Sequence, residues 1–495
     1  MGDADRWAIA VHKVWQDLTV PIPRGIAGSS CCAAGPWTFP AAAQYFCQRA
    51  IAGRGSGGAG QPMIALERSD LESPGAARKY PLKVGVLVDL DRGPEAGGHV
   101  KCWERLAGAA TAFVDRLDLT VHFSGSMARR EALSHNVRFV VERPVFSTAR
   151  LPFLSDVPDH TDLARWHPRL ARWLGRYDVI HTTDAFFAYA RTAMRVARKA
   201  GIPLVTSVHT NTPEYARIYT GLTIERLVGK GLVHRLLTDR LGLDRRVERR
   251  MLARLETHQR QCAFALLSRP ERVAQARARL GARVGFLRRG VDRAAFHPSR
   301  RDRAWLAATL GIPVDRVVVL FVGRVSRGKN VLVLADAVAG LVARGLPLQL
   351  VCAGKGELRE AVLARLGAGA RCLGPVEPAL LARLYASADI FALPSQIEES
   401  ANVVPEALAS GLPVLLAREG GMGRALVEGE TGLALPGASV SAWAEAIESL
   451  AKDGGRRARM AAAARRYAET ALPSWDEVLA EDLLPRWESA AEAGG

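Results

Sequence analysis

Two carboxylates eight positions apart, Glu398 and Glu406, are the groups in this chain best placed to do chemistry. They flank a turn into a helix expected to start near Val403, between an apolar strand at 390–393 and a second one at 414–417. A helix N-terminus offers free backbone N–H groups and a partial positive charge, which suit a diphosphate. Glu406, in the first turns of that helix, can reach sugar hydroxyls. The segment therefore predicts a site for a sugar attached to a diphosphate.

Parallel α/β structure is expected to hold these groups in place. From Lys83 onward, short β-branched runs alternate with helical segments, as βαβ units require. Parallel sheets bind ligands at the carboxyl ends of their strands, and the polar motifs of this chain lie at such ends. The expected strands are 84–88, 119–123, 137–140, 179–181, 204–208, 264–267, 284–287, 317–322, 348–352, 389–393 and 413–416. The expected helices are 99–112, 164–174, 185–199, much of 224–258, 330–343, 357–366, 378–386 and 403–410.

Composition limits the classes of protein that this chain can form. Its 495 residues suffice for two domains, and no run of about 18 apolar residues offers a membrane-spanning helix. Seven cysteines form no C-x-x-C pair, which argues against a disulfide framework. The first 30 residues lack the apolar centre of a secretory signal. Together these features predict a cytoplasmic protein.

The formal net charge of +17 is concentrated between residues 216 and 300, where 20 Lys or Arg stand against 7 Asp or Glu. Leu and Val recur there at helical spacing from Leu222 to Gln259. A basic amphipathic helix suits an anionic membrane, at about 1 kcal/mol per surface cation. The alternative is a set of solvated faces in a chain rich in Arg. Peripheral association with the inner face of the membrane is therefore left open, and no nucleic-acid partner is expected because no known binding module accompanies the charge.

The segment from Leu393 to Pro413 resembles the E-x7-E signature of the GT-B glycosyltransferases, in particular the retaining family-4 type. The resemblance runs from about residue 83 to 475 and is more specific in the second half. It is also carried by Arg289 to Asp292, Cys352 to Glu357 and Glu428 to Gly432. The fold that it implies is GT-B, an α/β architecture with two Rossmann-like parallel-sheet domains facing a central cleft.

Five parts are expected along the chain. Residues 1–80 are rich in glycine and turn-like segments without lasting periodicity, and they predict a disordered extension. The resemblance implies an acceptor-side domain at 81–291, a linker at 292–303, a domain for the nucleotide sugar at 304–474 and a C-terminal helix at 475–495 that crosses back to the first domain.

For the sugar-donor side, the resemblance implies that Arg324 and Lys329 hold the pyrophosphate of a nucleotide-diphosphate sugar. Fixed cations stabilise the negative charge that develops on a departing nucleoside diphosphate. No metal and no other cofactor is expected, and Asp89-Leu-Asp91, which has D-x-D spacing, is interpreted as structural. Glu399 is expected to be exposed or to make a second contact. The full set expected to bind the sugar donor is Gly323, Arg324, Lys329, Gly354, Glu398, Asn402, Val403 and Glu406.

For the acceptor side, Gly97 and Gly98 open a helix, and glycines there let the backbone approach a phosphate or sugar closely. The alternative is a tight turn between strand and helix. Lys101 lies near the same helix end. His209 follows a strand and, by the resemblance, is catalytic or binds sugar. His181 also ends a strand, and a structural role for it is equally open.

The glycine-rich stretch from Gly323 to Asn330 nearly spells a P-loop, but Asn330 replaces the Ser or Thr that ligates Mg²⁺. Ser400-Ala401 stands where family members often have an aromatic residue and glycine, which alters the expected fit of the sugar. An NTPase, a GT-B nucleotide-sugar epimerase or hydrolase, and a binding protein of this fold are the alternatives. We predict a retaining, metal-independent hexosyltransferase that acts on a hydroxyl of a glycan, lipid or lipid-linked acceptor. Its catalytic residues are expected to be His209, Arg324, Lys329 and Glu398.

Overall fold

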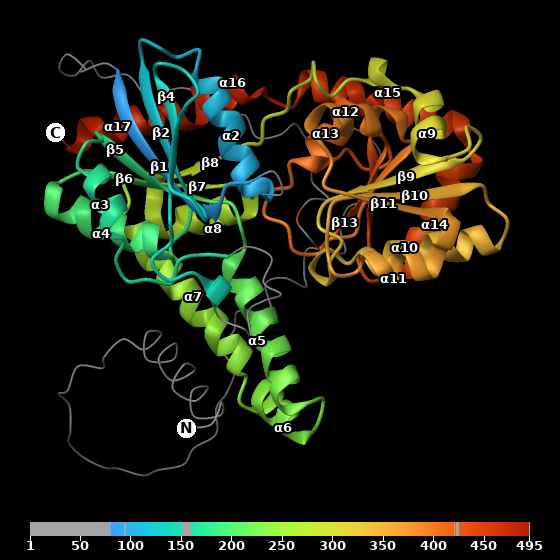
Figure 1. Ribbon diagram of the computed structural model, residues 1–495, viewed down its shortest axis with the longest axis horizontal. Coiled ribbons are helices and arrows are strands. Elements are labelled where there is room, and N and C mark those ends of the chain that lie inside the picture. Colours follow the sequence, from blue (N-terminus) through green and yellow to red (C-terminus); the bar gives the residue numbers. More distant parts are fainter. Residues whose placement is uncertain (1–80, 94–95, 151–159, 420, 422–424, 495) are drawn as a thin grey trace, which may run out of the picture. The chain divides into compact units, whose positions relative to one another are not determined.

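The computed structural model describes residues 81–494 except 94–95, 151–159, 420 and 422–424. The extension expected at 1–80 lies outside the described residues. Two sheets organise the described part (Figure 1). The larger has the strand order β3-β4-β2-β1-β5-β6-β7-β8, and the smaller has the order β11-β10-β9-β12-β13-β14. The two parallel-sheet α/β domains predicted from the sequence are confirmed.

In the larger sheet all paired neighbours run parallel except β3, which is antiparallel to β4. β3 was not predicted, because all four of its residues are exposed and supply no apolar alternation. The strands are β1 (Leu82–Asp91), β2 (Leu117–Ser124), β3 (Arg129–Ala132), β4 (Val137–Glu142), β5 (Val179–Thr182), β6 (Leu204–Val208), β7 (Phe264–Leu267) and β8 (Val284–Phe286).

Helices cover both faces of the larger sheet. Val84, Val86 and Val88 of β1 face one core with α2, whereas Leu87 faces the other with α3 and α4. This alternation is the period of two that a strand imposes on its side chains. The helices are α2 (Gly98–Ala110), α3 (Pro168–Leu174), α4 (Ala188–Ala200) and α8 (Pro270–Leu280).

A helical hairpin is inserted between the neighbouring strands β6 and β7. It comprises α5 (Thr212–Val228), α6 (Leu232–Arg235) and α7 (Leu243–Arg260). α5 and α7 pack along each other and run away from the sheet (Figure 1). Much of the range 224–258 is helical as predicted, in α6, a π-helical turn (Leu236–Arg240) and α7. The prediction missed the earlier start of the hairpin at Thr212, with Pro213 in the first turn of α5, and the break at Gly229.

The smaller sheet is entirely parallel, and each residue of its strand β9 is buried. Its strands are β9 (Val317–Val322), β10 (Leu348–Ala353), β11 (Ala370–Gly374), β12 (Ile390–Leu393), β13 (Val414–Ala417) and β14 (Gly432–Leu435). The helices of this part are α9 (Arg303–Leu310), α10 (Val331–Ala343), α11 (Arg359–Leu366), α12 (Pro378–Ser387), α13 (Val403–Ala409), α14 (Val440–Lys452) and α15 (Gly454–Thr470). Continuous apolar runs such as β9 are typical of parallel strands buried on both faces.

The C-terminal segment belongs to the core of the larger sheet. It consists of α16 (Trp475–Glu477), a π-helical stretch (Val478–Leu483) and α17 (Leu484–Gly494). Ser474 begins it with a capping box to Glu477. Trp475, Leu479, Leu483 and Trp487 are buried together with β1 and α2. None of the helices described is both long and apolar enough to span a bilayer.

Candidate functional site

Gly323 and Gly354 bring the loops after β9 and β10 into backbone contact. Their φ angles are +144° and +137°, which side chains rarely allow. A Cβ on Gly354 would lie 2.0 Å from the carbonyl oxygen of Gly323. Both positions therefore require glycine, and their contact fixes where Arg324 leaves the strand.

Lys329 and Glu398, both predicted site residues, form an ion pair between the loop after β9 and the loop after β12. Their side chains are 19% and 10% exposed. Burial alone would lower the pKa of the Lys329 ammonium, but the Glu398 carboxylate, with Tyr215, outweighs it and raises that pKa. Lys329 is therefore a cation held in a water-poor place, which is what binding of an anion requires.

Asn330, where a P-loop would carry its hydroxyl, has another role here. It adopts a left-handed backbone with φ +55°, which Asn tolerates better than most residues. Its side-chain amide donates a hydrogen bond to the carbonyl of Gly437. The residue thus fastens the start of α10 to the loop after β14, and its geometry is that of a structural turn.

Glu406 contacts the first domain. Its carboxylate is buried and lies 2.6 Å from the guanidinium of Arg105 on α2. Burial would lower the pKa of Arg105, but the charge and hydrogen bond of Glu406 raise it. The pKa of the neighbouring Tyr385 hydroxyl is raised by burial and by Glu406. The carboxylate expected to reach sugar hydroxyls is therefore engaged with Arg105 in this structure.

The first-domain glycine turn meets the start of α13. The amide nitrogen of Asn402 donates to the carbonyl of Gly98 at 3.0 Å, while the Asn402 amide oxygen is buried and has no partner in the described part. Gly97 precedes α2 with extended backbone. A Cβ on Gly98 would make only ordinary contact with Asn402, so space does not demand glycine there. Val403 begins α13, which has only seven residues.

The expectation of an exposed Glu399 is wrong. Its side chain is buried and lies 2.8 Å from Arg272 on α8. Burial raises the pKa of this carboxyl, and Arg272 and Arg269 oppose the rise. The loop after β12 is thus tied by Glu398 to Lys329 and by Glu399 to the first domain.

Lys101 and the D-x-D pair have local partners. The Lys101 ammonium lies 2.8 Å from Glu104 on the same helix. Asp89 is buried and accepts a hydrogen bond from the backbone of Tyr189 at 3.0 Å. Burial, followed by the charge of Asp184, raises the pKa of Asp89 well above its usual value. In the described part of the chain no group of three His, Cys, Asp or Glu side chains is placed to hold a metal ion.

His209 is buried at the end of β6 among four polar or aromatic neighbours. Its Nε2 lies 2.7 Å from Ser207 Oγ and 3.2 Å from Trp103 Nε1, and its Nδ1 lies 3.0 Å from an Arg289 nitrogen. Its ring stacks on His99 at 4.4 Å. Burial, followed by the charges of His99, Arg289 and His181, lowers its pKa well below the usual value. The ring is neutral at neutral pH.

A chain of hydrogen bonds runs from Trp487 to His209. The Trp487 indole, which can only donate, lies 2.9 Å from His181 Nδ1. Burial lowers the pKa of His181 to about 3, so its single ring proton is on Nε2, 2.8 Å from Ser207 Oγ. Ser207 Oγ in turn contacts His209 Nε2, which the Trp103 indole also faces. At the other edge of the His209 ring, the Arg289 guanidinium can only donate, so Nδ1 is the acceptor of their hydrogen bond.

The hydrogen bond with His209 positions the Arg289 guanidinium at this edge of the ring. Arg289 donates to His209 Nδ1 at 3.0 Å. A further Arg289 nitrogen donates to the Cys102 sulfur at 3.3 Å. The guanidinium has more N–H groups than these two contacts use, so it is suited to bind a hydroxyl or phosphate oxygen of a ligand.

Several contacts of the site could not be found from the sequence. Arg105, Arg272 and Tyr215 come from the first domain, and Tyr215 donates to the carbonyl of Ile397 at 3.4 Å. Each pairs with a residue more than a hundred positions away.

Two family models match the chain. The model of glycosyl transferases group 1 covers residues 316–453, and the model of glycosyltransferase family 4 covers residues 97–295. The D-inositol 3-phosphate glycosyltransferase of Rhodococcus erythropolis is 38% identical over 224 residues, which are 42% of this chain and 49% of that protein. The protein of the same name from Xylanimonas cellulosilytica is 31% identical, over 62% of this chain and 71% of its own length. The chain thus spans about half the length of the first of these relatives.

Solved structures share the fold. Sucrose-phosphate synthase from Thermosynechococcus elongatus has a TM-score of 0.58 and 18% identity, over 81% of this chain and 97% of that chain. Anabaena HepE, in complex with UDP-glucose, has a TM-score of 0.54 and 19% identity, over 81% and 99%. At these identities the likeness establishes the GT-B architecture and nothing finer.

Proposed function

Because the chain belongs to the family-4 glycosyltransferases of the GT-B fold, we propose that it transfers a hexose from a nucleotide-diphosphate sugar to an acceptor hydroxyl. The ion pair of Lys329 with Glu398, beside Arg324 at the carboxyl ends of β9 and β12, carries this proposal. It supplies a buried cation for a diphosphate and a carboxylate for sugar hydroxyls within one contact. The name of the curated relatives and the UDP-glucose complex of a fold relative support the same class of reaction.

In the proposed reaction the diphosphate replaces the Glu398 carboxylate as the ionic partner of Lys329 and also binds Arg324. Glu398 is thereby released to accept a hydrogen bond from a sugar hydroxyl. The bond between the anomeric carbon and the phosphate oxygen breaks, and the acceptor oxygen bonds to the same face of that carbon. The acceptor proton passes to the leaving phosphate oxygen. Because fixed cations stabilise the departing diphosphate, the transfer is proposed to need neither a metal nor another cofactor.

His209 is proposed to orient a sugar or acceptor oxygen. Its Nδ1 accepts a hydrogen bond from the Arg289 guanidinium and so aims the remaining N–H groups of Arg289 at that oxygen, and burial strengthens such bonds. The ring acts as a neutral acceptor, because burial holds its pKa far below neutral pH. The acceptor class is proposed to be a glycan, a lipid or a lipid-linked sugar, and the relatives' names add inositol phosphate to the acceptors worth testing.

The proposal is tested by thermal shift with UDP-, GDP- and ADP-hexoses in the presence of a chelator. A ligand at one hundred times its Kd should stabilise the fold by about 2.7 kcal/mol. We expect a shift with one nucleotide class that Arg324→Ala and Lys329→Ala abolish. Arg327→Ala is the matched control, because Arg327 is an exposed cation of the same loop.

Product analysis separates the alternatives. NMR of the glycoside formed should report the anomeric configuration of the sugar donor. An inverted product would contradict the retaining assignment. Conversion of the nucleotide sugar without any acceptor would favour an epimerase or hydrolase, and magnesium-dependent ATP hydrolysis would favour the NTPase alternative.

A further inference from the structure

The far end of the α5–α7 hairpin carries a cluster of exposed apolar side chains. We call residues 228–241, with the turn Gly229-Lys230-Gly231 in them, the hairpin tip. Leu232 is 83% exposed and Val233 is 52% exposed, and Leu232 exceeds every other large apolar side chain of the described residues in exposure. Val228, Leu236 and Leu241 are also exposed. A solvated helix end has no need of several adjacent aliphatic side chains, so this cluster indicates a binding surface.

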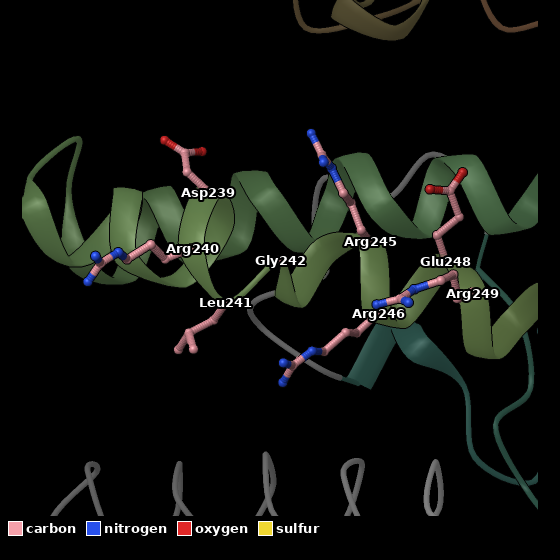
Figure 2. A pocket seen from close by; sticks show the side chains of 8 residues that line it. All are labelled: Asp239, Arg240, Leu241, Gly242, Arg245, Arg246, Glu248 and Arg249. Carbon is pink, nitrogen blue, oxygen red and sulfur yellow. The ribbon is translucent and has the colours of Figure 1, made fainter. Parts of the chain in front are cut away.

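Cations surround the apolar cluster. Residues 226–250 hold eight Lys or Arg and three Asp or Glu. An open hollow beside the tip is lined by Asp239, Arg240, Leu241, Gly242, Arg245, Arg246, Glu248 and Arg249. Figure 2 shows Leu241 between Arg240 and Arg246 on one side of the ribbon, with Asp239, Arg245 and Glu248 directed to the other. The two acidic groups are thus turned away from the side on which Leu241, Arg240 and Arg246 lie.

These cations are available for a partner. In the part of the chain that the structure describes, Arg240, Arg245, Arg246 and Arg249 are exposed and form no ion pair. The cations nearer the sheet differ, because Arg217 is paired with Glu248 and Arg260 with Glu256. Within the hairpin tip Lys230 is paired with Glu225, whereas Arg240 and the three arginines beside the tip keep an unpaired positive charge.

We propose that the hairpin tip docks on an anionic lipid bilayer. Apolar side chains beside unpaired cations match the boundary between acyl chains and phosphate head groups, where the first are buried and the second meet anionic lipid. A nucleic acid would satisfy the arginines but leave the aliphatic cluster in water. An apolar protein groove would cover the leucines but leave the arginines without acids.

Docking would also bring the proposed reaction to the membrane. α5 joins the tip to the carboxyl end of β6, since it begins three residues after His209. Tyr215, in the first turn of α5, contacts the loop after β12. This extension rests on the proposed function and points to a membrane-resident acceptor, whereas docking itself can be tested without any sugar.

The test is co-sedimentation of the full chain with phosphatidylcholine vesicles that contain or lack phosphatidylglycerol. Each surface cation contributes roughly fivefold to affinity for an anionic bilayer. Arg240→Glu with Arg246→Glu should therefore weaken binding to the anionic vesicles by about 25-fold or more. Leu232→Ser with Val233→Ser and Leu236→Ser should weaken it as well. Binding to vesicles of phosphatidylcholine alone should be weak.

Matched controls lie far from the tip. Val314→Ser with Leu380→Ser removes exposed apolar side chains, and Arg459→Glu with Arg466→Glu reverses two exposed cations of α15. Both should bind anionic vesicles like the unaltered protein, and all variants should keep its thermal unfolding midpoint. Equal loss in the controls, no loss in the tip variants, or equal binding to neutral vesicles would overturn the proposal.

Two further readouts separate the possible causes of failure. If the leucine variant is unaffected and polyglutamate or single-stranded DNA displaces the vesicles, the tip is a general polyanion surface and bilayer docking is excluded. Nucleotide-sugar thermal shift in the tip variants reports on the proposed function independently. If a tip variant lost both this thermal shift and vesicle binding, the variant would be misfolded. The leucine-to-serine and the arginine-to-glutamate variants change different residues, so the one that keeps the thermal shift still tests the docking.

Discussion

Around Lys329 and Glu406 the buried polar groups are ionised and paired, whereas around His209 they are neutral and joined by hydrogen bonds. The first region belongs to the loops of the smaller sheet and the second to the strand ends of the larger. Buried ions require a partner of opposite sign, but neutral rings and hydroxyls need only a matching donor or acceptor. The charged region is thus suited to exchange one anion for another, and the neutral region to orient uncharged hydroxyls.

Removing a cation from the charged region should have the largest effect on activity. It tests whether the ion pair of this region serves catalysis. Lys329→Ala should lower kcat by about 100- to 1000-fold, because a fixed positive charge on the leaving diphosphate is lost. Arg327→Ala is the control. Steady-state kinetics with the nucleotide sugar found by thermal shift would measure this effect. A Lys329→Ala enzyme with near-normal kcat would show that the buried pair is only structural.

A fall in pH should destabilise the region around His209 more than the region around Lys329. Burial lowers the pKa of His122 and His181 to about 3 and of His258 to about 4, and lowers that of His209 well below its usual value. The unfolded chain takes up these protons below about pH 6.5, so stability present above that pH is lost as the pH falls. At pH 5.5 each of these histidines should lower the free energy of unfolding by about 1.3 kcal/mol.

These histidines all lie in the first domain, and the chain contains none after His297. Burial raises the pKa of Asp89 and Asp184, which acts in the opposite direction. A net loss of stability between pH 7.5 and 5.5 is expected, smaller than the four histidines alone would give and confined to the larger sheet. Hydrogen exchange should show β1 and β5 losing protection before β9 and β12, and the reverse order would contradict the assignment of neutral histidines.

The contact of Glu406 with Arg105 tests whether a paired charge also stabilises the fold. Glu406→Gln should lower the free energy of unfolding by about 2 kcal/mol, less than for a fully buried pair because the Arg105 side chain is 30% exposed. Arg105→Met should cost a similar amount, and the double variant less than both together. Urea titration of the four proteins gives the coupling energy. Full additivity would mean that the two groups do not interact in solution.

The smallest effect concerns the neutral region. Trp487→Phe and Ser207→Ala should each lower kcat by about tenfold with little change in the KM of the sugar donor, because the chain of hydrogen bonds that orients the His209 ring toward Arg289 is broken. Nitrogen NMR of the His209 ring should report a mixture of tautomers in both variants. Ser410→Ala, which removes a buried hydroxyl without a partner in the described part, is the control. An unchanged His209 spectrum would show that the chain of hydrogen bonds from Trp487 does not control the protonation of the His209 ring.

The sequence predicted best the strands that are buried along nearly their whole length. β6, β7 and β9 have the expected bounds, because their runs of buried residues are long enough to be distinguished from loops. β3 has no buried residue and offered no such signal. α3 begins at Pro168 instead of residue 164, because His167 caps it and proline suits a first helical position.

The site was predictable where a motif is local, and not where two distant segments meet. Glu398 and Lys329 were both identified, and the structure pairs them. The sequence did not identify Arg105, Arg272 and Trp487 as site residues, because the sequence of a helix does not indicate which loop the helix will contact. Glu399 was placed wrongly for the same reason, since its burial depends on Arg272 from another domain.

The packing of the C-terminal segment against the larger sheet has a consequence for synthesis of the protein. Trp475, Leu483 and Trp487 complete a core whose first strand begins at Leu82, so this core closes only after the whole smaller sheet has been translated. During synthesis the apolar face of the first domain therefore stays exposed until the C-terminal segment is made. The second domain can fold as soon as its own residues have been translated. Chaperone binding to nascent chains should therefore persist past the point at which β14 is exposed and end when Trp487 emerges.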